Sequence, residues 1–177
     1  MRLVEESCFY PHLGVGEIME MEKIQYWMGH AVKLAQQAAS QDEIPIGCVI
    51  VHNGTAISDG MNLREQSHKT TDHAEIVALE KFNLKNHTWR LPENSWVFVT
   101  AEPCMMCTGA LLWARAQNVV FGCPDPKQAG ILRISPWIEQ GVFDHRFENV
   151  LGGVLEKECA QLLKDYFKSK RVPNSLK

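Results

Sequence analysis

The chain has 177 residues, 45% of them apolar and 22% charged, which is enough for one substantial core but short for two independent domains. Six cysteines are too sparse for a disulfide scaffold, and no apolar run reaches the roughly 18 residues that a membrane-spanning helix needs. We therefore expect one compact, soluble, cytoplasmic domain with reduced thiols and no membrane partner.

The formal charge of −3 is unevenly distributed along the chain. Residues 1–22 hold five glutamates and one arginine, a net −4, whereas residues 164–177 hold five basic residues against Asp165, a local +4. The basic end could bind phosphates. The more ordinary interpretation of the same residues is a solvated terminus, and the sequence leaves both interpretations open.

The first half of the chain is expected to hold an extension, a helix and a hairpin. Residues 1–20 show no sustained period and predict an irregular extension. Apolar residues at three-and-four spacing predict a helix over Met21–Ala39. Two β-type runs, Ile46–Val51 and Thr55–Ser58, flank Asn53-Gly54, whose residue types suit a hairpin turn.

The remaining elements alternate between helices and strands. The expected helices are Ala74–Phe82, Cys107–Ala116 and Leu155–Phe167, and the expected strands are Trp96–Thr100, Asn118–Gly122 and Phe147–Leu151. Residues 124–136, rich in proline and glycine, are expected to form a loop. This alternation predicts an α/β layered sheet that begins with a hairpin.

Two short motifs carry the residue types of a metal site. They are His73-Ala74-Glu75 and, about thirty residues later, Pro103-Cys104-Met105-Met106-Cys107. Each motif falls where a predicted helix begins. Residues three apart share a helix face, so both cysteines can coordinate one ion. The N–H groups exposed at a helix N-terminus favour the thiolate form that metals bind.

Two thiolates and one imidazole make three ligands, so a tetrahedral zinc ion would keep one position open for water. Glu75 lies two residues past His73 and is close enough to act as a base toward that water. Each motif alone has a plainer reading, because a lone C-x-x-C is often a redox pair or half of a structural zinc site. No second C-x-x-C exists in the chain. The combination therefore predicts one catalytic Zn²⁺ per chain.

The paired motifs resemble the signature of the cytidine-deaminase-like superfamily, and within it the chain resembles the bacterial tRNA-specific adenosine deaminases. The resemblance extends from about Ile24 to Arg171. Besides the two motifs it includes Tyr26-Trp27-Met28, Glu43-Ile44-Pro45-Ile46-Gly47, Asn62, Val119-Val120-Phe121-Gly122, Asp125 with Lys127, His145-Arg146 and Glu158-Cys159-Ala160.

The resemblance implies a three-layer α/β/α fold of the cytidine-deaminase type, with a five-stranded mixed sheet. The deaminase domain would occupy residues 21–171, between the extension and a C-terminal tail of residues 172–177. The protein would be a homodimer that converts adenosine to inosine at the wobble position of the tRNA anticodon loop. His73, Cys104 and Cys107 would hold the zinc ion, and Glu75 would carry protons from the water to the ring nitrogen and the departing ammonia.

The resemblance also implies contacts with the substrate. Asn62 would hydrogen-bond the flipped base, Ile44 would line its pocket, and Ala74 would position it through the backbone. Asp125, Lys127 and the end of the last helix, including Phe167, would touch the anticodon loop. From the residue types alone, each of these has an ordinary reading as a core, turn or surface residue.

Three features depart from the family pattern: the extension, the loop sequence Gln128–Arg133, and Asp144, where relatives usually have asparagine. They bear on the substrate rather than on the chemistry, because an added carboxylate repels phosphate. One alternative function is therefore a deaminase of free nucleobases or nucleosides, of guanine or cytosine type. Another is a zinc-stabilised RNA-binding module without turnover, which would not require Glu75.

Overall fold

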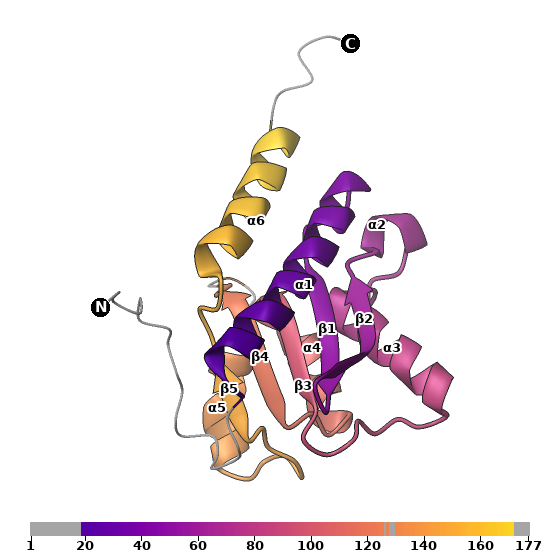
Figure 1. Ribbon diagram of the computed structural model, residues 1–177, viewed down its shortest axis with the longest axis vertical. Helices are drawn as coiled ribbons and strands as arrows, with labels where there is room; N and C mark the ends of the chain where they lie inside the picture. The colour runs from indigo at the N-terminus through magenta and orange to yellow at the C-terminus, as the bar shows by residue number, and fades with distance from the viewer. Residues whose placement is uncertain (1–18, 126, 128–129, 172–177) are drawn as a thin grey trace, which may run out of the picture.

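The computed structural model describes residues 19–125, 127 and 130–171, so nearly all of the expected extension and the whole expected tail lie outside the described residues. Figure 1 shows the arrangement of the elements. In chain order these are α1 (Met21–Ser40), β1 (Gly47–His52), β2 (Thr55–Met61), α2 (Arg64–Ser67), α3 (Ala74–Asn86), β3 (Trp96–Ala101), α4 (Met105–Trp113), β4 (Asn118–Cys123), α5 (Ile131–Glu139), β5 (Asn149–Leu151) and α6 (Glu156–Lys170).

The five strands form one mixed sheet in the order β2-β1-β3-β4-β5. Strand β1 lies between β2 and β3 and is antiparallel to both. The pairs β3–β4 and β4–β5 are parallel, and a helix connects the two strands of each pair. The predicted hairpin and the five-stranded mixed sheet are both confirmed.

Helices cover both faces of this sheet. Side chains of α3, α4 and α5 pack with one set of strand residues, including Ile50, and α1 and α6 pack with the other set, including Val51. Successive residues of a strand point to opposite faces, which explains why neighbours on β1 belong to different layers. Figure 1 shows α1 and α6 side by side on their face. The three-layer α/β/α prediction is confirmed.

The expectation of a loop over residues 124–136 is wrong in its second half, where α5 begins at Ile131. Ile131, Ile134 and Ile138 lie on the buried face of this helix. Pro136 lies inside α5 and cannot donate a hydrogen bond to Leu132, but the Ser135 hydroxyl donates to that carbonyl at 3.0 Å. The burial of the isoleucines therefore outweighs the proline that suggested a loop.

The bounds of α4 and the presence of α2 also differ from the sequence expectation. The helix expected at Cys107–Ala116 is α4, which begins at Met105 and ends at Trp113. It ends early because Arg115 adopts a left-handed backbone conformation with φ of +63°. The four-residue helix α2 is absent from the prediction because it is too short to show an apolar period.

Gly60 brings α3 close to the sheet. A Cβ atom at Gly60 would lie 2.3 Å from the carbonyl oxygen of Ala74 and 2.6 Å from the backbone nitrogen of Ala78. Only glycine allows this approach, which fixes the first turn of α3 against β2. Among the described residues, no helix combines the length and apolarity required to cross a membrane.

Candidate active site

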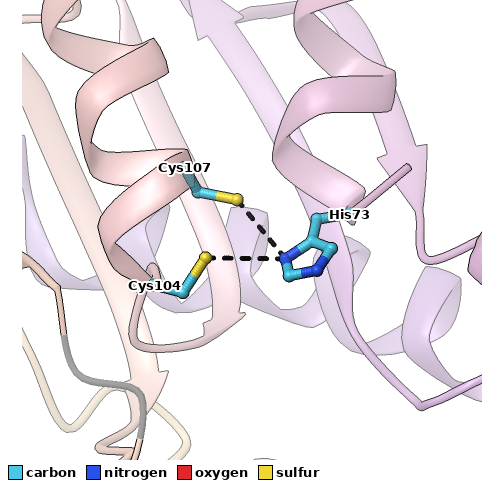
Figure 2. Close-up of side chains that lie close together, drawn as sticks. All are labelled: His73, Cys104 and Cys107. Atoms are coloured by element: carbon cyan, nitrogen blue, oxygen red, sulfur yellow. Dashed lines mark hydrogen bonds between the residues drawn. The ribbon is translucent and has the colours of Figure 1, made fainter. Parts of the chain in front are cut away.

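The starts of two helices bring the two sequence motifs together. His73 is the N-cap residue of α3, and Cys104 is the N-cap residue of α4, with Cys107 in the first turn of that helix. Figure 2 shows the imidazole of His73 facing both sulfur atoms across the gap between the helix ends. The prediction that both motifs lie at helix starts and meet at one point is confirmed.

The geometry of this cluster fits a tetrahedral zinc ion. The Sγ atoms of Cys104 and Cys107 each lie 3.6 Å from Nδ1 of His73, and the three ligand atoms all lie within 4.8 Å of one another. Bond lengths of about 2.3 Å to sulfur and about 2.0 Å to nitrogen, at the tetrahedral angle, place sulfur and nitrogen about 3.5 Å apart. These residues are thus positioned to hold a metal ion, with Nδ1 of His73 as the ring nitrogen that faces both sulfur atoms.

Hydrogen bonds within the cluster shift the pKa values of its three side chains. The Cys107 thiol beside Cys104 lowers the pKa of Cys104 to about 4, and the same interaction raises the pKa of Cys107. The pKa of His73 is also raised, chiefly by its hydrogen bond with Cys104. Without metal the cluster therefore retains protons that a bound cation would displace.

Glu75 lies beside the cluster in a buried position. It is the second residue of α3, two positions after the ligand His73, and the residue is only 4% exposed. Burial raises the pKa of Glu75 to about 7. A carboxyl group with this pKa can accept and return a proton near neutral pH.

Two of the expected base-contacting residues, Asn62 and Ala74, lie in segments next to the metal cluster. Asn62 is buried directly after β2, and its backbone N–H donates to the Ile46 carbonyl at 3.0 Å. The next residue, Leu63, donates its N–H to Asp72 at 3.0 Å, which fixes this segment beside His73. Ala74 is fully buried at the start of α3.

The remaining expected contacts lie in three other parts of the chain. Ile44 is half-buried in the segment between α1 and β1. The backbone N–H of Asp125 donates to Glu102 at 3.3 Å, and the Asp125 carboxylate accepts the backbone N–H of Lys127 at 2.9 Å. Phe167 is exposed on α6, outside the metal cluster.

Two buried carboxylates in the site region were missed as functional candidates. Glu43 accepts a hydrogen bond from Asn62, and Glu102 accepts the backbone N–H groups of Asp125 and Leu132. Both side chains are buried, and each precedes a proline by one or two residues. The sequence offers one indication of their burial: each follows a predicted helix or strand and comes just before a proline. This indication is weak because acidic residues in such positions are usually solvated.

His145 is held by the fold and lies outside the metal cluster. Its Nε2 atom is 2.7 Å from the carbonyl oxygen of Ala116. This contact ties His145 to the segment that follows α4, apart from the metal ligands, and gives it a structural role. The five cysteines that the structure describes are free thiols, as expected: Cys48, Cys104, Cys107, Cys123 and Cys159.

Comparison with known proteins shows that the chain is similar to zinc-binding deaminases. Residues 21–123 match the family described as the cytidine and deoxycytidylate deaminase zinc-binding region. The tRNA-specific adenosine deaminase of Bacillus subtilis (strain 168) is 38% identical over 151 residues, which span 85% of this chain and 92% of that protein.

Solved structures of deaminases are also similar to this chain. A structure from a study of A-to-I editing by tRNA:A34 deaminases at the wobble position superposes with a TM-score of 0.72 at 32% identity, covering 78% of this chain and 99% of that one. Guanine deaminase from Bacillus subtilis superposes with a TM-score of 0.55 at 32% identity, covering 60% of this chain and 66% of that one.

Proposed function

The chain belongs to the family of tRNA-specific adenosine deaminases, within the zinc-binding deaminases, and on that premise we propose that it converts adenosine to inosine at the wobble position of tRNA. One observation carries the choice of substrate: the similarity spans 92% of a tRNA-specific relative. The guanine deaminase structure from Bacillus subtilis, at the same 32% identity, is covered to 66% of its length, whereas the tRNA deaminase structure is covered to 99%.

The residues around the cluster supply the chemistry of a hydrolytic deamination. When bound, zinc acts as a Lewis acid that lowers the pKa of a water molecule toward neutrality. Glu75 accepts a proton from the attacking water and delivers it to the ring nitrogen of adenine. Glu75 then shuttles the second proton to the departing amine, so adenosine and water become inosine and ammonia. Its burial keeps this proton exchange away from bulk solvent.

Three residues are proposed to hold the target base. Asn62 would hydrogen-bond it, Ile44 would line the pocket, and the Ala74 backbone would position the ring beside Glu75. The support is their placement, because hydrogen bonds from Asn62 and Leu63 fix the segment after β2 next to His73. A base displaced from a single-stranded loop costs less to accommodate than one taken from a duplex.

The anticodon loop is proposed to lie against Asp125, Lys127 and the end of α6. Lys127 and Phe167 are exposed, and the last turn of α6 adds Lys168 and Lys170. Basic side chains neutralise phosphates, and an exposed aromatic ring can stack on a base. A tRNA substrate would also place the protein in the cytoplasm.

A second copy of the chain is proposed to cover an exposed apolar surface on α4. Met105, Met106 and Trp113 are exposed on this helix, and Trp113 retains 72% of its accessible surface. Trp113 and Val142 line a hollow of about 150 Å³. Methionine and tryptophan are enriched in protein interfaces. Analytical ultracentrifugation at micromolar concentration should show a dimer that Trp113→Asp dissociates; a monomeric wild type would contradict the proposal.

Ammonia release from a panel of substrates tests the proposed function. The panel contains a tRNA anticodon stem-loop with wobble adenosine, the same stem-loop with wobble guanosine, and free adenosine, guanine and cytosine. We expect turnover of the adenosine stem-loop and none of its guanosine counterpart. Turnover of free guanine or cytosine without action on the stem-loop would overturn the tRNA assignment. Binding of the stem-loop without ammonia release would indicate an RNA-binding module.

A further inference from the structure

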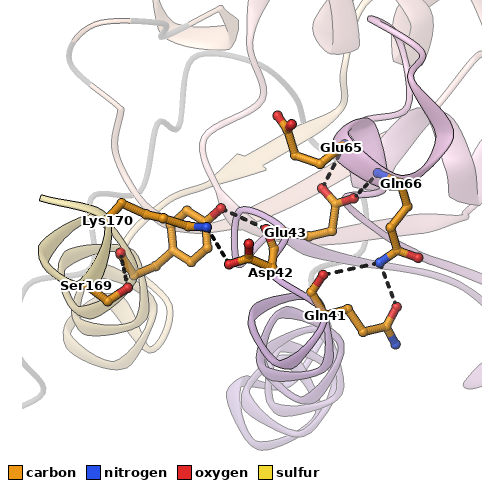
Figure 3. A network of polar contacts seen from close by, with 8 residues as sticks. Gln41, Asp42, Glu43, Glu65, Gln66, Ser169 and Lys170 are labelled. Carbon is orange, nitrogen blue, oxygen red and sulfur yellow. Dashed lines mark hydrogen bonds and ion pairs between the residues drawn. The ribbon is translucent and has the colours of Figure 1, made fainter. Parts of the chain in front are cut away.

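Glu43 is a fully buried carboxylate that binds three N–H donors. Its side chain is 0% exposed and lies in the segment between α1 and β1. The Asn62 side chain donates Nδ2–H to Oε2 at 2.8 Å. The backbone N–H groups of Glu65 and Gln66 in α2 donate to Oε2 at 3.2 Å and to Oε1 at 2.8 Å, as Figure 3 shows. One carboxylate thus links Asn62 to α2.

This contact determines which end of the Asn62 amide is turned toward Glu43 and which is left for a ligand. An ionised carboxylate has only acceptors, so the amide must turn its nitrogen toward Glu43 and cannot rotate by 180° without opposing two oxygens. Oδ1 and the second Nδ2 hydrogen then remain for a ligand. The pattern of donors and acceptors offered by Asn62 is therefore set by its neighbour rather than by Asn62 itself.

The segment that carries Glu43 is also anchored from α6. The preceding residue, Asp42, has a left-handed backbone conformation with φ of +65°. Its carbonyl oxygen accepts a hydrogen bond from the Tyr166 hydroxyl at 3.0 Å, and its carboxylate pairs with Lys170. Figure 3 shows Lys170 reaching Asp42 from the neighbouring helix. Contacts from α2, α6 and Asn62 therefore hold two consecutive residues, which limits how far Glu43 can move.

We propose that Glu43 is a positioning residue that fixes the amide orientation of Asn62 and thereby the base edge that the pocket accepts. The proposal rests on the proposed function, in which Asn62 contacts the target base. Glu43→Gln replaces one acceptor by a donor, so the three N–H donors can no longer all be satisfied. The substituted amide can offer Asn62 either an oxygen or an N–H group, so it no longer fixes one orientation of the Asn62 amide, while the metal cluster keeps its own residues.

A matched control is available at the far end of the sheet. Glu148 is half-buried, and its Oε1 accepts a side-chain hydrogen bond from Gln117 at 2.6 Å, next to β5. Glu148→Gln therefore removes a carboxylate that binds an amide side chain, outside the site. Zinc content and thermal stability measured for both variants show whether either protein is misfolded.

The first readout does not depend on any substrate. In ¹⁵N NMR spectra of the zinc-loaded protein, the side-chain amide of Asn62 is identified by its disappearance in Asn62→Ala. We expect nuclear Overhauser contacts between this amide and the backbone amide protons of Glu65 and Gln66. The contacts should be lost in Glu43→Gln and kept in Glu148→Gln. Persistence of the contacts in Glu43→Gln would overturn the proposal.

The second readout is a double-mutant cycle on the stem-loop with wobble adenosine. We expect Glu43→Gln to lower kcat/KM by roughly tenfold or more, mainly through KM, because it disturbs a contact with the bound base. In the Asn62→Ala background the same change should have an effect of less than about threefold. Equal losses in both backgrounds would show that Glu43 acts independently of Asn62.

The two readouts separate the possible failures. If the wild type does not deaminate the stem-loop, the proposed function fails, and the NMR contacts still test whether Glu43 orients Asn62. If the wild type is active but the cycle shows no coupling, the proposed function stands and the positioning role is refuted.

Discussion

Substituting Gly60 tests whether the packing of α3 against β2 sets the geometry of the active site. A Cβ atom there would lie 2.3 Å from the Ala74 oxygen, whereas ordinary contacts begin at 3.4 Å. Gly60→Ala must therefore displace the start of α3 by about 1 Å, the difference between these distances. Overpacking of this kind costs about 1–3 kcal/mol of stability. A misplacement of about 1 Å can lower a rate by roughly a hundredfold.

The shift falls on the catalytic residues because Ala74 stands between His73 and Glu75. We expect Gly60→Ala to lower both the melting temperature and kcat/KM. The matched control is Gly29→Ala in α1, where nothing lies within 4 Å of the added Cβ. Alanine is better than glycine within a helix by about 1 kcal/mol, so the control should melt about 2–4 °C higher and stay fully active. Wild-type stability and activity in Gly60→Ala would refute the packing argument.

Three further predictions concern the metal and the core. Cys104→Ser should lose most of the zinc, measured by atomic absorption as metal per chain; full metal content and activity would refute the ligand set. Zinc should be retained through gel filtration at pH 8 and progressively lost toward pH 5, because the raised pKa values of His73 and Cys107 mean that protons compete for these ligands as the pH falls. Phe98→Ala removes a fully buried ring from β3 and should cost about 3–5 kcal/mol of unfolding free energy in denaturant titrations; a cost below about 1 kcal/mol would contradict its place in the core.

The metal centre could be predicted from the sequence because its ligands belong to short motifs, each at the start of a helix. Cys104 and Cys107 are three residues apart at a helix start, and His73 stands in the same position at another helix. A motif of this kind carries its geometry within one turn of helix. The sheet was predictable for a similar reason, since its strands are apolar runs bounded by turn residues.

The rest of the site depends on contacts that no local pattern records. Glu43 and Asn62 are 19 residues apart, and the charge of Glu43 gives no sign that it is buried against α2. Likewise, α5 was hidden by Pro136, because its stability comes from burying isoleucines against the sheet rather than from helix propensity. In both cases tertiary packing outweighs the local preference.

The most direct test of the central claim is Glu75→Gln, assayed for ammonia release from the stem-loop with wobble adenosine and for zinc in the same sample. The amide has nearly the same shape as the carboxyl group but cannot exchange the proton. We expect activity to fall by at least about a hundredfold, the lower end of the contribution of a general base, while about one zinc ion per chain is retained. Activity close to that of the wild type, with zinc bound, would contradict the claim.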